Sequence, residues 1–158
     1  MTVSAFLAKH LEQGVVLVTL VAARGSTPRE AGATMAVSAA AMAGTIGGGQ
    51  LEFHCIDLAR AMLTTSEARR ELAIPLGPQM GQCCGGHVEV ALQRAGAPEL
   101  AAVAAREKAQ AAMRPSILIF GAGHTGRALA QALAPLPFAT LLVDDRDGVL
   151  DGLPRAIT

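Results

Sequence analysis

Two adjacent cysteines, Cys83 and Cys84, are the most reactive side chains in the sequence. They follow Gln82 in the segment Gly77–Gly86, whose glycine and proline content predicts a loop. Thiols among glycines can be approached closely, and nearby backbone N–H donors favour the thiolate. Thiolates bind soft metals and take part in sulfur transfer, so this loop is a candidate site for either. The alternative interpretation is a pair of small hydrophobic residues.

The third cysteine, Cys55, lies on the apolar side of a predicted helix and is interpreted as a buried hydrophobic residue. A zinc site can be drawn from Cys84 and His87 with Cys55 or His54, but it lacks a proper second pair of ligands. An odd number of cysteines, two of them adjacent, is also a poor disulfide framework. It indicates a reducing compartment and therefore predicts a cytoplasmic protein.

Three consecutive glycines, Gly47, Gly48 and Gly49, stand between a predicted strand and a predicted helix. Successive glycines can turn backbone N–H groups inward as a nest for a phosphate or another compact anion, and the helix N-terminus adds its dipole. Glu52, in the first helical turn, is placed to interact with that dipole and with a donor-rich ligand. The competing interpretation is a tight crossover from strand to helix. Three glycines exceed what a crossover needs, so we favour an anion site.

The loop that follows the first apolar strand brings an arginine next to two hydroxyl groups. Arg24 is suited to bidentate contacts with an anion, and Ser26 and Thr27 add hydrogen-bonding groups. A polar surface loop without a ligand would have the same composition. Arg24 and Ser26 are therefore candidate binding residues, and an unliganded surface loop is the alternative interpretation.

A second glycine motif has the spacing of a dinucleotide-binding turn. Gly121, Gly123 and Gly126 follow an apolar strand and open a predicted helix. In such turns the first glycine makes the turn, the second lets the backbone approach a pyrophosphate, and the third permits close packing of helix on strand. The motif predicts a site for NAD(P) or another nucleotide.

The next strand ends in Asp144, at the position where an acid can bind a ribose hydroxyl. Arg146 can in principle read a 2′-phosphate, but we interpret it as a solvated loop charge. The alternative for the whole motif is a Rossmann fold that has lost its ligand and keeps the glycines for packing.

The elements that position these motifs alternate between helix and strand. We expect helices at Val3–Gln13, Gln50–Leu63, Glu99–Met113 and Thr125–Leu133, and strands at Val15–Ala23, Thr34–Ser38, Ala43–Ile46, Leu72–Leu76, His87–Leu92, Ser116–Phe120 and Thr140–Val143. The first strand is so uniformly apolar that both of its faces should be covered, whereas His87–Leu92 alternates and should be half-exposed. The fold class is therefore α/β: a mixed α/β domain over residues 1–95, a connecting helix over 96–115, and an incomplete Rossmann-type βαβ unit over 116–158.

The composition is that of an ordinary globular protein. Of 158 residues, 51% are hydrophobic and 16% charged, which argues against disorder. Acidic and basic residues balance at 13 each, so we expect neither nucleic acid nor an anionic membrane as a partner. The longest apolar run is about half of the ~20 residues that a membrane span needs, and the N-terminus lacks the pattern of a secretory leader.

Four segments together resemble the XdhC/CoxI family of xanthine dehydrogenase accessory proteins. They are Gly25–Gly32 with Met35, Gly44–Glu52, Leu76–Gly86, and Gly121–Gly126 with Asp144–Arg146. The first three are specific in combination, and the match runs from about Val15 to Asp147. The run of glutamine, two cysteines and two glycines is similar to the XdhC branch.

The resemblance implies a chaperone for the molybdenum cofactor (molybdopterin) rather than an enzyme. Proteins of this family bind the mature cofactor, support the exchange of its oxo ligand for sulfur by a cysteine desulfurase, and hand it to xanthine dehydrogenase. The cofactor's phosphate would suit Gly47–Gly49, and its soft metal end would suit Cys83 and Cys84. The alternatives are an NAD(P)-dependent oxidoreductase and a carrier of cysteine persulfide.

The chain departs from the family pattern where the Rossmann-type domain stops. Family members continue through a full domain, so we expect a fragment, a truncated member, or a sheet that a partner chain completes. The open parallel edge after Thr140–Val143 favours pairing with a second copy, and hence a homodimer.

Overall fold

The computed structural model describes residues 1–77 and 85–151. The chain divides into two compact units, Met1–Ala105 and Arg106–Thr158, and the boundary lies within helix α3 (Ala97–Ala112). Over the described residues, no helix is long and apolar enough to cross a membrane. The predicted α/β fold class is confirmed.

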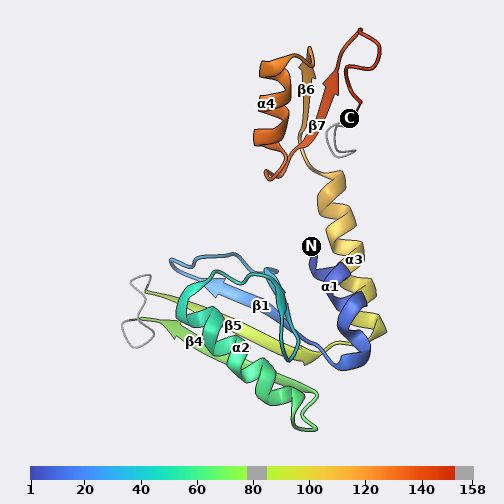
Figure 1. Ribbon diagram of the computed structural model, residues 1–158. Coiled ribbons are helices and arrows are strands. Elements are labelled where there is room, and N and C mark those ends of the chain that lie inside the picture. Colours follow the sequence, from blue (N-terminus) through green and yellow to red (C-terminus); the bar gives the residue numbers. More distant parts are fainter. Residues whose placement is uncertain (78–84, 152–158) are drawn as a thin grey trace. The chain divides into compact units, whose positions relative to one another are not determined.

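The first unit is built on a five-stranded antiparallel sheet with the order β3-β2-β1-β5-β4 (Figure 1). The strands are β1 (Val16–Arg24), β2 (Thr34–Val37), β3 (Met42–Gly44), β4 (Arg69–Leu76) and β5 (Gly86–Arg94). Helix α2 (Gly49–Leu63) covers one face. Helix α1 (Val3–His10), which continues as the 3-10 turn η1 (Leu11–Gln13), packs on the opposite face together with the first half of α3.

The core under α2 follows from two periodicities. Leu51, Cys55, Ala59 and Met62 recur at helical spacing on one side of α2 and are almost fully buried. On the sheet, alternate residues of β1 and β5 point to the same side. The residues of β1 and β5 that face α2 are almost fully buried: Val16, Val18, Leu20, Val88, Val90 and Leu92.

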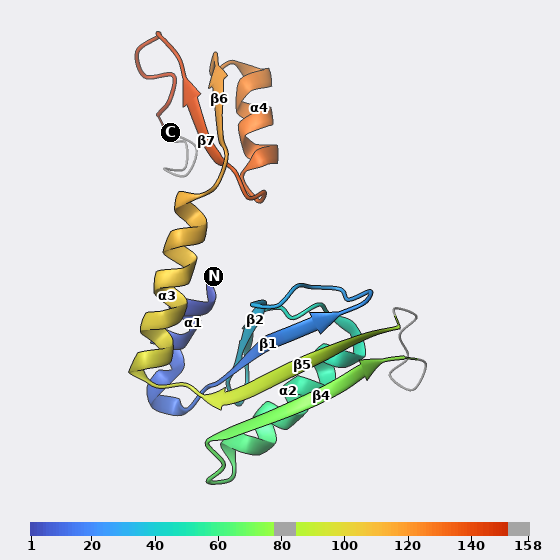
Figure 2. The same ribbon diagram turned by 180° about the vertical axis from the view of Figure 1, so that it is seen from behind.

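The opposite face of the sheet is covered only in part. Phe6 and Leu7 of α1 and Val103 of α3 pack with Ala36 and Ala43, so these helices cover β2, β3 and the beginning of β1 (Figure 2). The prediction that both faces of the first strand are covered is wrong, because β1 alternates between buried and partly buried residues and Val21 is 53% exposed. A uniformly apolar strand can thus have one face only partly covered by helices. This is possible when its outward-facing residues are small or lie at the edge of the area that the helices cover. We call this half-covered side the outer face.

A β-bulge interrupts the pairing of β1 with β5 at Val21. Leu20 pairs with Val90 and Ala22 with Glu89, so Val21 has no partner of its own. Beyond the bulge, Ala23 pairs with the buried Val88, and Arg24 pairs with His87.

The second unit has the predicted order of strand, glycine turn, helix and parallel strand. It comprises β6 (Ser116–Phe120), α4 (His124–Leu133) and β7 (Ala139–Val143), with β6 and β7 paired in parallel. One face packs on α4 through Ile119, Ala130 and Leu142. The other face presents Leu118, Phe120 and Leu141 to solvent, whereas parallel sheets are ordinarily covered on both sides.

Candidate functional site

Three loops meet at one end of the sheet in the first unit. Strand β1 ends there at Arg24, which pairs with His87, and β4 ends at Leu76, which pairs with Gly86. The segments that follow β1 and β4 therefore leave the sheet at the same end. Gln82, Cys83 and Cys84 belong to the second of these segments and lie outside the described residues. The hairpin is closed at its base by a 2.8 Å hydrogen bond from the Gly85 N–H to the Leu76 carbonyl.

The loop after β1 and the start of β5 are in backbone contact. A Cβ atom on Gly86 would lie 2.3 Å from the Ser26 carbonyl oxygen and 2.9 Å from Cγ2 of Thr27. Gly25 has φ +72° and faces the Gly86 Cα from the other side. A side chain at position 86 would not fit, so Gly86 lets the loop that carries Arg24 and Ser26 lie against the base of the cysteine loop.

The three-glycine turn joins the same cluster through Pro28. Gly47 has φ +132°, and a Cβ atom on it would lie 2.6 Å from Cγ of Pro28 and 3.5 Å from Cγ of Arg29. Pro28 and Arg29 belong to the polar segment that follows β1 and resembles the family, although neither is among the predicted binding residues. The structure thus brings together, at one sheet end, motifs that are about 20 to 60 residues apart in the chain.

The Glu52 carboxylate occupies the three-glycine turn. Its Oε2 accepts hydrogen bonds from the Thr45 hydroxyl at 2.5 Å, the Ile46 N–H at 3.1 Å and the Gly48 N–H at 3.1 Å. The turn therefore has the inward-facing donors expected of an anion nest, and the anion that they bind in this structure belongs to the protein. Sequence reasoning placed Glu52 beside a ligand and missed Thr45.

Arg24 is an exposed cation among the predicted binding residues. Its side chain is 78% exposed, and its ion pair with Glu89 spans 4.0 Å. An exposed pair at this distance holds a guanidinium only weakly. Arg24 is consequently free to turn toward an anion next to Ser26, which is also exposed.

Cys55 is a core residue, as predicted. Its side chain is fully buried on the sheet-facing side of α2, and burial, reinforced by the negative charge of Glu52, raises the pKa of its thiol to about 11. The thiol is therefore neutral at physiological pH and a poor nucleophile. Among the described residues there is no group of three His, Cys, Asp or Glu side chains that could hold a metal ion.

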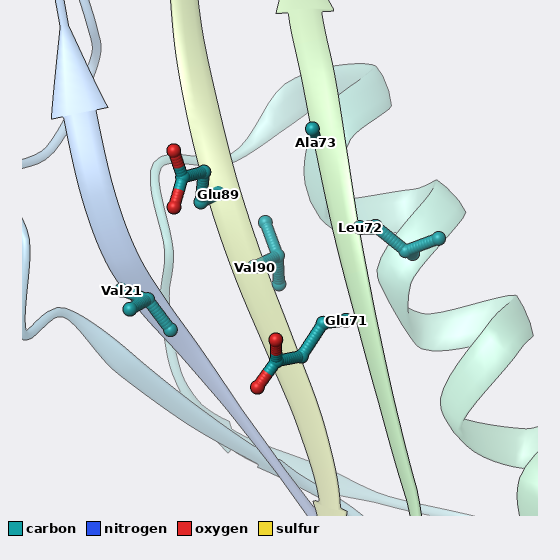
Figure 3. A pocket seen from close by; sticks show the side chains of 6 residues that line it. All are labelled: Val21, Glu71, Leu72, Ala73, Glu89 and Val90. Atoms are coloured by element: carbon teal, nitrogen blue, oxygen red, sulfur yellow. The ribbon is translucent and has the colours of Figure 1, made fainter.

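A hollow of about 250 Å³ lies on the outer face of the sheet (Figure 3). Val21, Ala73, Glu71 and Glu89 line it, and the two carboxylates lie on the side of the strands turned away from α2. Arg69 is paired with Glu71 at 2.6 Å, which offsets one of these charges. The hollow contains none of the predicted site residues.

The glycine turn of the second unit has the packing that its spacing predicts. A Cβ atom on Gly126 would lie 1.9 Å from the Gly121 carbonyl oxygen, so the third glycine lets α4 approach the turn. Gly121 has φ +96°, and a Cβ on Gly123 would meet nothing within 4 Å. Position 123 is thus open to an approaching ligand, as expected of the second glycine.

Asp144 and Arg146 form a close ion pair beside this turn. The Nε and Nη2 of Arg146 each donate to a different carboxylate oxygen of Asp144 at 2.8 Å. The Arg146 side chain is 62% exposed, as expected of a solvated loop charge, and it is paired with Asp144. These bonds, with those from the Ala122 and Arg146 N–H groups, hold the pKa of the Asp144 carboxyl well below its usual range.

Part of this chain matches a known protein family. Residues 9–73 match the model of the XdhC and CoxI family. This segment includes the loop after β1, the three-glycine turn and α2, which confirms the resemblance read from the first two of its four segments.

Two individual proteins are similar over most of the chain. An uncharacterized protein of Escherichia coli K12, YqeB, is 30% identical over 128 residues, which are 79% of this chain and 21% of YqeB. The crystal structure of a Bacillus halodurans protein described as a xanthine dehydrogenase superposes with a TM-score of 0.75 at 16% identity, over 96% of this chain and 65% of that one. The chain thus spans about a fifth of the length of its curated relative, and the structural likeness shows a shared fold.

Proposed function

We propose, because residues 9–73 match the model of the XdhC and CoxI family, that this protein is a chaperone in the maturation of xanthine dehydrogenase. In this proposal it binds the molybdenum cofactor, supports its sulfuration by a cysteine desulfurase, and delivers it to the apo-enzyme. The observation that carries the proposal is the convergence of the Arg24 loop, the Gly47–Gly49 turn and the base of the cysteine loop at one end of the sheet. A protein that carries a cofactor needs such a cluster of binding groups but no catalytic residue.

The cofactor offers two chemically different ends to this cluster. Its phosphate is a compact dianion, for which an exposed arginine beside hydroxyl groups is a suitable partner. Arg24 and Ser26 are placed to take this role first, because the N–H groups of Ile46 and Gly48 already bind Glu52. The turn then contributes its shape, since Gly47 packs on Pro28 and sets the position of the loop that bears Arg24.

The metal end of the cofactor is soft and suits thiolate sulfur. We assign it to Cys83 and Cys84, whose loop starts and ends within the same cluster at Gly77 and Gly85. When bound, the cofactor would supply the metal whose oxo ligand is exchanged for sulfur. The chain's own contribution is to hold the phosphate, to keep two thiols beside the metal and to limit the access of water. A homodimer through the open edge of β7 is part of the proposal.

The experiment that tests the proposal uses protein purified from a host that makes the cofactor. We expect molybdenum and a pterin that fluoresces after oxidation to co-purify in near-equal amounts. Arg24→Ala should lower the bound pterin about tenfold, because it removes a charged hydrogen-bond partner of the phosphate. Arg60→Ala, an exposed arginine of α2, is the matched control and should retain the pterin. Protein that carries neither molybdenum nor pterin, and takes up none when cofactor is added, would contradict the proposal.

The double variant Cys83→Ser, Cys84→Ser distinguishes two roles of the thiols. If they bind the metal, the variant should lose molybdenum and pterin together. If they carry persulfide sulfur, the variant should keep the cofactor and lose only its sulfuration, measured as reactivation of desulfo-xanthine dehydrogenase. If the variant keeps both the cofactor and its sulfuration, the two cysteines have neither role.

A further inference from the structure

We propose that the second unit binds a nucleotide whose adenosine ribose carries a 2′-phosphate, as in NADP, and that Arg146 selects it. The inference concerns residues 106–151 alone and is independent of the chaperone function proposed for the first unit. It depends on how Asp144 and Arg146 are connected to the glycine turn.

The glycine turn is held in place before any ligand arrives. The Ala122 N–H donates to Oδ2 of Asp144 at 2.6 Å, and the Ala122 carbonyl accepts from Nε of Arg127 at 2.9 Å. The Gly121 N–H donates to the Val143 carbonyl at 2.8 Å. The peptide groups on both sides of Ala122 are therefore fixed, whereas Gly123 faces open space at the N-terminus of α4. A rigid turn with an open second glycine is the arrangement that receives a pyrophosphate.

Asp144 has no acceptor capacity left for a ribose. An ionised carboxylate offers about four lone-pair positions. Oδ1 accepts from the N–H and the Nε of Arg146, and Oδ2 accepts from the Ala122 N–H and the Nη2 of Arg146. The side chain is only 3% exposed. Nucleotides with an unmodified ribose are recognised by a free acidic acceptor at this strand end, and Asp144 does not provide one.

Arg146 presents the opposite chemistry at the same place. A guanidinium has five N–H donors, and Asp144 occupies two of them. The remaining donors lie on a side chain that is 62% exposed, and they suit a phosphate. The ion pair also neutralises the carboxylate that would otherwise repel a phosphate at the ribose. Asp145 is an exposed carboxylate next to the pair and should weaken phosphate binding slightly.

Calorimetry on the full chain tests the proposal with small probes that need only this half of a dinucleotide site. We expect adenosine 2′,5′-bisphosphate to bind at least about tenfold more tightly than adenosine 5′-monophosphate, since charged hydrogen bonds to the extra phosphate distinguish them. NADP should exceed NAD by a similar factor. Equal binding within each pair, a preference for the unphosphorylated ribose, or no binding of any probe would overturn the proposal.

Three variants make the result specific. Arg146→Ala should bring the two probes to similar affinity, because it removes the phosphate partner and frees lone pairs on Asp144. Gly123→Val should abolish binding of both probes without straining the fold, since Gly123 has φ −71° and a Cβ there meets no atom. Arg60→Ala removes the same charge from the first unit and should change neither affinity. Retention of the 2′-phosphate preference in Arg146→Ala would assign the preference to another residue and overturn the role of Arg146.

Discussion

Gly86 lies so close to Ser26 that a Cβ atom at position 86 would stand 2.3 Å from the Ser26 carbonyl oxygen. The contact joins two backbones, so neither side can yield by rotating a side chain. It connects the loop that bears Arg24 to the base of the loop that contains both adjacent cysteines. The geometry of the candidate site thus depends on a position that carries no functional group.

Gly86→Ala should therefore destabilise the first unit and separate the two loops. We expect a loss of about 1–3 kcal/mol in the free energy of unfolding, the usual cost of forcing extra atoms into a packed region. Gly77→Ala is the matched control at the other end of the same loop, because its Cβ would meet no atom within 4 Å. Urea denaturation of both variants checks the prediction, which fails if the two are equally stable.

Glu52→Ala should also destabilise the first unit, because it leaves two backbone N–H groups and the Thr45 hydroxyl without their acceptor. Hydrogen bonds to a charged group contribute about 1.5–3 kcal/mol, and partial exposure places the expected loss at the lower end. Amide exchange of Ile46 and Gly48 should accelerate in parallel. Glu12→Ala, in η1, removes an exposed carboxylate of equal charge and should leave these amides unchanged.

Cys55 should resist alkylation in the folded protein. Its pKa of about 11 leaves little thiolate at pH 8, and the side chain is fully buried. Mass spectrometry after brief treatment with iodoacetamide should find Cys55 unmodified, and the same treatment in urea should modify it. Rapid labelling under native conditions would mean that α2 opens far more readily than its packing suggests.

The second unit should lose stability in acid through Asp144. Because the folded state lowers the pKa of this carboxyl, the stabilisation is fully present above the ordinary carboxyl pKa of about 4 and is lost as the pH falls toward the depressed value. In Asp144→Asn, the Ala122 N–H should therefore exchange with solvent faster than in the wild type at pH 6. The difference in exchange rate between the two proteins should narrow toward pH 2. A difference that is constant with pH would show that ionisation of Asp144 is not the source.

Local patterns were sufficient to predict most elements. The helical spacing of Leu51, Ile56 and Met62 predicted α2, and the alternation from His87 to Leu92 predicted β5. The strand–turn–helix–strand order of the second unit also follows from its sequence, because the glycine spacing is set by contacts within a short stretch of chain.

Contacts between distant segments were not predictable in the same way. Nothing in the sequence around Ser26 indicates that Gly86 lies against it, because that contact depends on the order of strands in the sheet. Glu52 had been expected beside a ligand, whereas its distance of four residues from Gly48 lets it reach back into the turn. The pairing of Arg146 with Asp144 was not predicted, because a pattern of charges does not reveal which lone pairs are occupied.

The bulge at Val21 determines which side of the sheet Arg24 belongs to. In an uninterrupted strand, residues separated by an even number share a side, so Arg24 would lie with the buried Leu20, under α2. The unpaired Val21 shifts this count by one, and Arg24 instead pairs with His87 on the outer side. The number of residues between Leu20 and Arg24 therefore fixes the side of the sheet on which Arg24 lies. Deleting Val21 would remove the bulge and leave Arg24 on the outer face of a regular strand, whereas deleting two residues would place its guanidinium on the core side, under α2.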